Sequence, residues 1–318
     1  VEYTNAGADL IKKIAPDKTV IGLGSNTPTN FHALNLGVSP QLDGVVDHPY
    51  TYSLPPEKVP FGWNLAERDG IRVGDAENTF AGLIGSYREQ FRKTGKMRTV
   101  WITEFGFTGF WFDGKNETGL YAGFTEEAQA VYLVRRFIEG LPVAVSCQYD
   151  FLDDYGSGEH DAESNFGLLR ADYSRKPAFY AVRRMNMLLH NAQPDPAAKV
   201  KVTAAPLHRS AQRGELIRDW DKQSIAAENG VRAYAFSDPA APRERMLAVW
   251  SMQPYGREFN NRAVTLEIGG WERFAGLPAA VDLITGDSFG IPFEVEDGRL
   301  RIEDLPLKEH PLLITFRE

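Results

Sequence analysis

The stretch VWITEFG, residues Val100–Gly106, is the part of the sequence around which the fold is organised. Its β-branched and aromatic residues predict a buried strand, and a lone carboxylate, Glu104, stands at the end of that strand, before the turn at Gly106. The parallel strands of a (β/α) barrel carry catalytic groups at their C-terminal ends. The stretch therefore predicts a catalytic carboxylate, although a charged residue that merely ends a strand gives the same pattern.

The composition is that of an ordinary globular protein. Its 318 residues are 43% hydrophobic and 25% charged, and they suffice for two domains. A net charge of −8 argues against nucleic acid and against anionic membrane surfaces as partners. No stretch is long and apolar enough to span a bilayer. The single cysteine, Cys147, excludes a disulfide framework, and its apolar neighbours predict core packing.

Strands alternate with helices up to residue 190. The expected strands are Thr19–Gly24, Gly44–Tyr50, the stretch through Glu104, and Leu141–Tyr149, and the expected helices are Tyr3–Ile14, Asn30–Leu36, Asp75–Lys93, Thr125–Glu139 and Lys176–His190. This alternation predicts parallel pairing, in an α/β barrel or an open sheet. A complete barrel has eight strands in about 250 residues. Four strands cannot close a barrel, so half of it is expected to be absent.

After Asn191 the pattern changes to short strands separated by turns. The expected strands are Val200–Val202, Val231–Phe236, Met246–Trp250, Ala263–Ile268, Ala280–Leu283, Leu300–Ile302 and Leu312–Phe316. Such a series predicts an antiparallel β-sandwich. The fold class expected is therefore α/β plus all-β, with half of a (β/α)8 barrel at residues 1–190 and a β-sandwich at residues 191–318.

Polar and aromatic side chains gather around the predicted strand ends. Alternation along Gly44–Tyr50 places His48 and Tyr50 on one face, so both are expected to look into the barrel mouth. A lone histidine is more often structural than catalytic, but the His-x-Tyr pair fits a functional site as well as a structural one. Phe110 and Trp111 follow Glu104 in a loop and suit stacking on sugar rings, although a loop can equally pack its own aromatic residues.

Four motifs, in this order, resemble retaining glycoside hydrolases of the large (β/α)8 clan, especially families 5 and 39. They are Phe31–Tyr50, which ends in DGVVDHPY at Asp43–Tyr50, WITEFG at Trp101–Gly106, QYDFLDD at Gln148–Asp154, and ESNFGLL at Glu163–Leu169 leading into KPAFYA at Lys176–Ala181. The resemblance implies that residues 1–190 form strands five to eight of the barrel, and a C-terminal β-sandwich is common in such enzymes.

The resemblance also implies roles for individual residues. Glu104 takes the place of the nucleophile at the end of strand seven, and Tyr50, beside His48, would donate a hydrogen bond that keeps it ionised. Retaining hydrolysis needs a second carboxyl group, the acid/base, about 5 Å away. In the family this group ends strand four, which would lie upstream of Val1. A companion segment or chain with strands one to four is therefore an expected partner, together with a carbohydrate substrate.

The remaining candidates are less specific. The clan usually has tryptophan at the end of strand eight, where Gln148 stands here, so Tyr149 or Trp111 is expected to form the sugar platform, and Asn26 joins the expected substrate-binding residues. The acidic loop residues are expected to form loop hydrogen bonds rather than to act as the acid; they are Glu117, Asp153, Asp154, Glu159, Asp161 and Glu163. This chemistry requires no metal or organic cofactor, and no His, Cys or Asp cluster has ligand spacing.

Two alternatives from other classes stay open. In one, the protein binds carbohydrate without catalysis, and its half barrel is a scaffold for aromatic side chains that grip sugar. In the other, it is a structural subunit that completes the barrel of another protein. Replacing Glu104 with glutamine separates the binding protein from the enzyme, because binding should survive in both whereas turnover should collapse in the enzyme.

Overall fold

The computed structural model describes residues 1–24, 26–51, 54–59, 73–75, 78–109, 125–154, 156, 161–205, 230–253, 255 and 261–318. These residues fall into two compact units. Unit 1 comprises Val1–Gly106 and Arg136–Phe151, and unit 2 comprises Phe107–Arg135 and Leu152–Glu318. The domain boundary expected at residue 191 stays a prediction.

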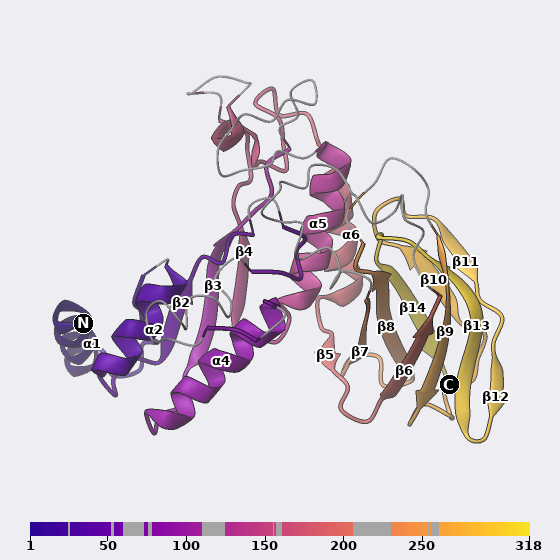
Figure 1. Ribbon diagram of the computed structural model, residues 1–318, viewed down its shortest axis with the longest axis horizontal. Coiled ribbons are helices and arrows are strands. Elements are labelled where there is room, and N and C mark those ends of the chain that lie inside the picture. The colour runs from indigo at the N-terminus through magenta and orange to yellow at the C-terminus, as the bar shows by residue number, and fades with distance from the viewer. Residues whose placement is uncertain are drawn as a thin grey trace. The chain divides into compact units, whose positions relative to one another are not determined.

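A four-stranded sheet in the order β1-β2-β3-β4 is the centre of unit 1 (Figure 1). Its strands are β1 (Ile21–Gly22), β2 (Gly44–Asp47), β3 (Thr99–Phe105) and β4 (Val145–Gln148). All three neighbouring pairs are parallel, as the alternation of strands and helices predicted. Unit 1 also contains the helices α1 (Glu2–Ile14), α2 (Thr27–Leu36) and α4 (Phe80–Lys93), while α5 (Glu126–Glu139) begins in unit 2 and ends in unit 1.

Helix α4 shows why its sequence is helical. Its five apolar residues at helical spacing are all buried; they are Phe80, Leu83, Ile84, Tyr87 and Phe91. The helix begins five residues later than Asp75, the start that its sequence pattern predicted, because Thr79 is its N-cap. The Thr79 hydroxyl accepts a hydrogen bond from the Gly82 N–H at 2.9 Å, and the Asp75 carboxylate in turn accepts the Thr79 N–H at 2.8 Å.

Several strands of unit 1 are shorter than predicted. Strand β2 ends at Asp47 because Pro49, two residues further on, has no N–H to donate to a ladder. Strand β4 begins only at Val145, because the turn that follows α5 extends to Val143, whose N–H bonds the Gly140 carbonyl at 3.0 Å. The expectation that Cys147 packs in the core is wrong: it is exposed, on an edge strand where no described side chain covers it.

Unit 2 contains two antiparallel sheets that form a β-sandwich. One has six strands in the order β11-β10-β14-β8-β7-β5, and the other has four in the order β12-β13-β9-β6. Their bounds are β5 Gln193–Pro194, β6 Lys199–Ala204, β7 Val231–Ser237, β8 Glu244–Ser251, β9 Arg262–Gly269, β10 Ala279–Asp282, β11 Ser288–Gly290, β12 Glu294–Glu296, β13 Arg299–Leu307 and β14 Leu312–Arg317. The sequence predicted seven of these strands and missed β5, β11 and β12, which are only two or three residues long.

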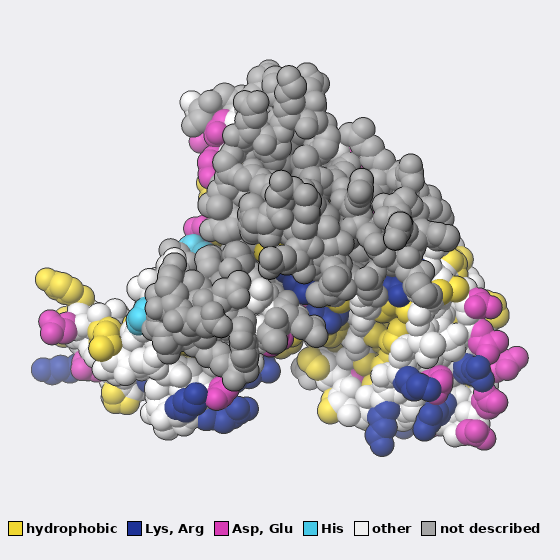
Figure 2. Space-filling model, in the orientation of Figure 1, with side chains coloured by type: hydrophobic (Ala, Val, Ile, Leu, Met, Phe, Trp, Pro, Cys, Tyr) yellow, Lys and Arg dark blue, Asp and Glu magenta, His cyan; other side chains and the backbone are white. Residues whose placement is uncertain are grey.

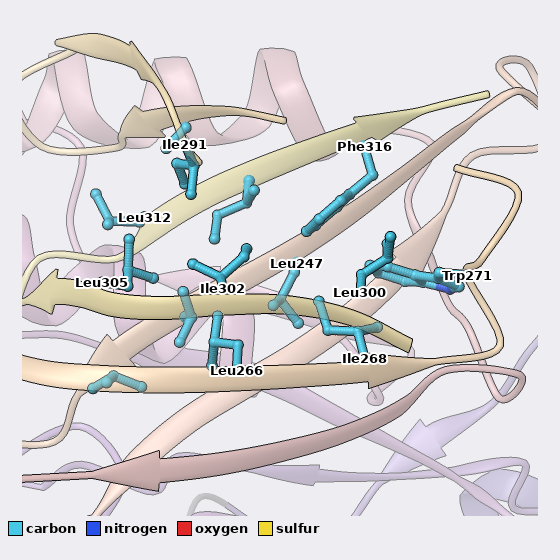
Figure 3. Close-up of a cluster of buried hydrophobic side chains, with 14 of the residues drawn as sticks. Leu247, Leu266, Ile268, Trp271, Ile291, Leu300, Ile302, Leu305, Leu312 and Phe316 are labelled. Atoms are coloured by element: carbon cyan, nitrogen blue, oxygen red, sulfur yellow. The ribbon is translucent and has the colours of Figure 1, made fainter. Parts of the chain in front are cut away.

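The core of the sandwich lies between its two sheets (Figure 3). Leu247 of β8, Leu266 of β9 and Ile302 of β13 have no exposed surface. The outer face carries charges of both signs, which Figure 2 shows beside one another, and the ion pairs include Lys201–Glu267 at 2.9 Å and Arg299–Glu267 at 3.3 Å. Inward apolar and outward charged side chains alternate along these strands, as in a sheet with one solvated face.

Unit 2 also contains a short 3-10 helix, η2 (Ala162–Asn165), and helix α6 (Pro177–Leu189). Pro177 stands at the first position of α6, where its missing N–H costs nothing. Among the helices that the structure describes, none is both long and apolar enough to cross a bilayer.

Candidate active site

Glu104 lies at the C-terminal end of β3, where the pairing with β4 becomes irregular. Ile102 pairs with Ser146, but the next pair joins Phe105 to Gln148, so β3 has one residue more than β4 over this interval. An extra residue of this kind is a β-bulge, which redirects side chains and is common beside active sites. It explains how Thr103 and Glu104, consecutive residues that would face opposite sides of a regular strand, both contact the ring of His48.

One carboxylate oxygen of Glu104 receives both of its contacts within the described residues. The Tyr50 hydroxyl donates to Oε2 at 3.1 Å, and Nδ1 of His48 lies 3.3 Å from the same oxygen. The side chain of Glu104 is 40% exposed, against 19% for His48. The other oxygen, Oε1, has no partner among the described residues, so one oxygen is held and the other is available.

The other nitrogen of the His48 ring also has a partner. The Thr103 hydroxyl lies 2.7 Å from Nε2, and a hydroxyl can either donate to a ring nitrogen or accept from it. The ring of His48 therefore contacts Thr103 through one nitrogen and Glu104 through the other.

Asp47, the residue before His48, is a buried carboxylate that the sequence analysis did not select. It accepts the His48 N–H at 2.9 Å, the Tyr87 hydroxyl at 2.7 Å, and the Thr27 hydroxyl at 2.8 Å. Burial raises the pKa of Asp47 to about 6, and the hydrogen bonds from Tyr87, Thr27 and His48 oppose that rise. Its place in the motif DGVVDHPY was the available signal.

Helix α2 joins this buried network through Asn30. Its amide donates to the Val46 carbonyl at 2.8 Å and to the Tyr87 hydroxyl at 3.1 Å. Its side-chain oxygen accepts the Gly24 N–H at 2.9 Å. The side chain of Asn30 therefore connects the loop after β1, strand β2 and helix α4.

The loop after β4 supplies exposed aromatic side chains. Gln148 ends the strand, and its amide donates to the Asp150 carbonyl at 2.5 Å. The Tyr149 N–H donates at 2.7 Å to the carbonyl of Phe105, the residue that follows Glu104. The peptide bond between Tyr149 and Asp150 is cis. Tyr149 is 38% exposed and Phe151 is 60% exposed, which adds Phe151 to the aromatic residues at this strand end.

Of the other expected substrate-binding residues, the structure describes Asn26, which has no contact with Glu104. Asn26 is the N-cap of α2, and its side chain accepts the Thr29 N–H at 3.1 Å. Its expected contact with substrate stays a prediction. Phe110 and Trp111 lie outside the described residues.

The acidic loop residues form hydrogen bonds within unit 2. Asp153 is buried and pairs with the Lys176 ammonium at 2.7 Å, while its Oδ1 also accepts the Gly167 N–H at 2.8 Å. Asp154 accepts the Gly156 N–H at 3.0 Å, and Glu163 is exposed. Glu117 and Glu159 lie outside the described residues. Loop bracing was the interpretation preferred for this group, and Asp153 and Asp154 fit it.

No three His, Cys, Asp or Glu side chains gather as a metal site within the part of the chain that the structure describes. Tyr50, His48 and Thr103 are the described side chains that organise the Glu104 carboxylate. This arrangement suits a carboxylate that reacts through one oxygen while the other is fixed.

Three solved structures are similar over nearly the whole chain. A family 39 glycoside hydrolase from Bacteroides cellulosilyticus WH2 has a TM-score of 0.61 and 20% identity, covering 99% of this chain and 54% of that one. A family 51 α-L-arabinofuranosidase from Bifidobacterium longum has a TM-score of 0.51 and 12% identity, covering 100% and 63%. A glucosidase from Croceicoccus marinus has a TM-score of 0.50 and 15% identity, covering 99% and 63%.

No protein-family model matches the sequence, and no curated protein matches it significantly. The chain spans 54% to 63% of the length of the three similar structures. Identities of 12% to 20% establish likeness of fold. The chain has the fold of part of a (β/α)8 barrel followed by an antiparallel β-sandwich, and it shares that fold with glycoside hydrolases.

Proposed function

We propose that this protein is a retaining glycoside hydrolase that acts on a poly- or oligosaccharide, with Glu104 as the nucleophile. The observation that carries the proposal is the asymmetric environment of the Glu104 carboxylate. Tyr50 and His48 both approach Oε2, and Oε1 has no described partner. The Tyr50 hydroxyl donates to Oε2, and an ionised carboxylate, which is the nucleophilic form, accepts such a bond through one oxygen and can react through the other.

The reaction would proceed in two displacements. In the first, Oε1 of Glu104 attacks the anomeric carbon and the glycosidic bond breaks, while an acid protonates the leaving oxygen. In the second, the group that acted as the acid now acts as a base and deprotonates a water molecule. This water attacks the anomeric carbon of the glycosyl-enzyme and releases Glu104. The net configuration at the anomeric carbon is retained, because each displacement inverts it once.

The acid/base is proposed to lie on a companion segment or chain that carries the remaining strands of the barrel. Two observations support this. Strands β1 and β4 are the edges of a parallel sheet of four described strands, whereas the barrel has eight. The similar structures are also longer, since the chain covers 54% of the family 39 enzyme.

Helix α6 offers a surface that the companion segment would cover. An open groove of about 380 Å³ lies along it, with a mostly apolar lining made of Leu168, Phe179, Val182, Arg183, Asn186 and Met187. Met187 is 65% exposed, unusual for a large apolar side chain next to a groove. A helix of the companion segment that packs on α6 would bury this groove.

The substrate is proposed to lie across the strand ends of unit 1. Tyr149 and Phe151 present exposed rings after β4, which suits stacking against the apolar face of a sugar. Gln148, Asn26, Phe110 and Trp111 complete the proposed substrate-binding set. The chemistry uses carboxylates alone, so neither a metal nor an organic cofactor is part of the proposal.

Replacement of Glu104 with glutamine tests the proposed reaction. Hydrolysis of oligosaccharides by the variant should be at least about 1,000-fold slower than by the wild-type enzyme, because the nucleophile is lost. The affinity of the variant for oligosaccharide should persist. Glu163→Gln is the matched control, since Glu163 is an exposed loop carboxylate, and it should leave turnover unchanged. Wild-type binding without any turnover would instead favour a carbohydrate-binding protein.

Denaturing intact-mass analysis of the active enzyme from its source tests the companion segment. The proposal expects either a chain heavier than 35.5 kDa or a second polypeptide that co-purifies with activity. Full activity from a single species of 35.5 kDa would refute it.

A further inference from the structure

Arg136, on helix α5, is buried and spans the loop that leads away from the candidate active site. Its Nη2 donates to the Pro49 carbonyl and its Nη1 to the Pro56 carbonyl, both at 2.6 Å. Pro49 lies between His48 and Tyr50, the two residues that approach Glu104. One guanidinium therefore bonds both Pro49 and Pro56, and Pro49 lies between His48 and Tyr50 in the sequence.

The chemistry of the three residues makes this contact hard to replace. Proline has no N–H, so at positions 49 and 56 the carbonyl is the only backbone group available for a hydrogen bond. A guanidinium has a rigid fork of donors that can reach two separate acceptors, whereas a lysine ammonium concentrates its donors on one atom. The Phe80 ring fixes the fork further, with its centroid 3.7 Å from the guanidinium carbon.

Arg136 keeps its charge in this buried position. Burial lowers its pKa to about 9, against the opposing effect of Glu139, Glu57 and Asp47. The group is therefore still protonated at neutral pH, and both of its hydrogen bonds to carbonyls are charge-assisted. Such bonds hold the carbonyls of Pro49 and Pro56 more strongly than neutral ones would.

The residues around Tyr50 are consequently held from two sides. The Asp47 carboxylate accepts the His48 N–H at 2.9 Å, and the Arg136 guanidinium donates to the carbonyl of Pro49, the residue after His48. We propose that Arg136 is a positioning residue that holds the His48–Tyr50 segment so that the Tyr50 hydroxyl and the His48 ring both approach Oε2 of Glu104. Its catalytic consequence rests on the proposed role of Glu104, but the positioning itself does not.

Histidine NMR tests the positioning without substrate or turnover. The chain has six histidines, so the ring Cε1–H spectrum contains six signals, and the variant His48→Gln identifies that of His48. In Arg136→Lys the charge remains but the bridge between the two carbonyls is lost. The His48 signal should therefore move by more than its linewidth while the other five keep their positions.

Arg135→Lys is the matched control. Arg135 is the preceding residue on α5 and is also buried. It likewise donates to two backbone carbonyls, those of Gln253 at 2.9 Å and Met252 at 3.2 Å. Its replacement should lower the melting temperature without moving the His48 signal. A general loss of packing, by contrast, would affect both variants alike.

The outcomes separate clearly. A His48 signal unmoved in folded Arg136→Lys, or moved equally by Arg135→Lys, would overturn the proposal. If Arg136→Lys does not fold, Phe80→Leu removes only the ring that stacks on the guanidinium and should shift the same signal by a smaller amount; an unshifted signal there would also overturn it. A failed turnover experiment on Glu104 would leave this result intact, so the two proposals fail separately.

Discussion

The side chains around Glu104 make its two carboxylate oxygens unequal. Oε2 is approached by the Tyr50 hydroxyl and the His48 ring, and the Thr103 hydroxyl contacts the other nitrogen of that ring. A nucleophilic carboxylate requires one oxygen that is free to form a bond and a charge that neighbouring donors stabilise. The described contacts fit both conditions: Tyr50 donates to Oε2, and Oε1 has no partner among the described residues.

Tyr50→Phe removes the hydroxyl that donates to Glu104 and keeps the aromatic ring. A hydrogen bond to a charged group contributes about 1.5–3 kcal/mol. The loss should therefore lower kcat/KM by about 10- to 100-fold, measured on the enzyme from its source. Tyr173→Phe, at an exposed position, is the control and should leave kcat/KM unchanged. Equal rates for Tyr50→Phe and wild type would remove Tyr50 from the site.

Asp47 makes the stability of the protein depend on pH. Because its folded pKa of about 6 lies above the ordinary value of 3.8, the folded state binds the proton more tightly than the unfolded state. This contribution to stability is fully present below the unfolded value and is lost as the pH rises through about 6.

Asp47→Asn removes that titration. The free energy of unfolding of wild type, measured relative to Asp47→Asn by urea denaturation, should fall by about 2 kcal/mol between about pH 4.5 and about pH 7.5. The comparison cancels the other titrating groups, which both proteins share. Parallel pH profiles for the two proteins would show that Asp47 has the same pKa in the folded and unfolded states.

Among the elements, the loops after β3 and β4 are joined by a buried polar network in unit 2. Lys176, the N-cap residue of α6, pairs with Asp153 and also donates to the Asn165 carbonyl at 3.1 Å. Gln129 of α5 donates to the Phe107 carbonyl at 2.9 Å. Burial raises the pKa of Asp153 and lowers that of Lys176, and the contact between them opposes both shifts.

Lys176→Met should destabilise the protein by about 3–5 kcal/mol in urea unfolding, because it leaves the Asp153 charge buried without its partner. The double variant Asp153→Leu with Lys176→Met should recover part of this loss, since no charge then remains, although the Gly167 N–H loses its acceptor. Lys201→Met is the control, because its ion pair with Glu267 is exposed and should contribute less than about 1 kcal/mol. A similar small cost for Lys176→Met would contradict the network.

The sequence predicted those elements that its local patterns specify. The VWITEFG stretch predicted β3 with Glu104 at its end, and the apolar spacing predicted the buried face of α4. The buried polar contacts were not predictable, because their partners are distant in the sequence: Arg136 and Pro49 are 87 residues apart. The bulge at Thr103 and Glu104 also escaped, since it is a property of the pairing between two strands.

At the scale of the whole molecule, the chain combines a parallel sheet with an antiparallel sandwich, and it shares this combination with solved glycoside hydrolases that are longer than itself. The sandwich has a hydrophobic core between its sheets, whereas the parallel sheet has four described strands, half the number in a (β/α)8 barrel. The proposed reaction therefore combines the proposed nucleophile, Glu104, with an acid/base that we propose to lie on the companion segment.

The most direct measurement is covalent trapping of the nucleophile. Dinitrophenyl glycosides with fluorine next to the anomeric carbon have a leaving group that needs no acid, and the fluorine slows hydrolysis of the glycosyl-enzyme. A panel of such glycosides with different sugars, followed by peptide mass analysis, should show one glycosyl unit on the peptide that contains Glu104, and none in Glu104→Gln. An adduct on another carboxylate, or hydrolysis of natural substrate by enzyme that no member of the panel labels, would contradict Glu104 as the nucleophile.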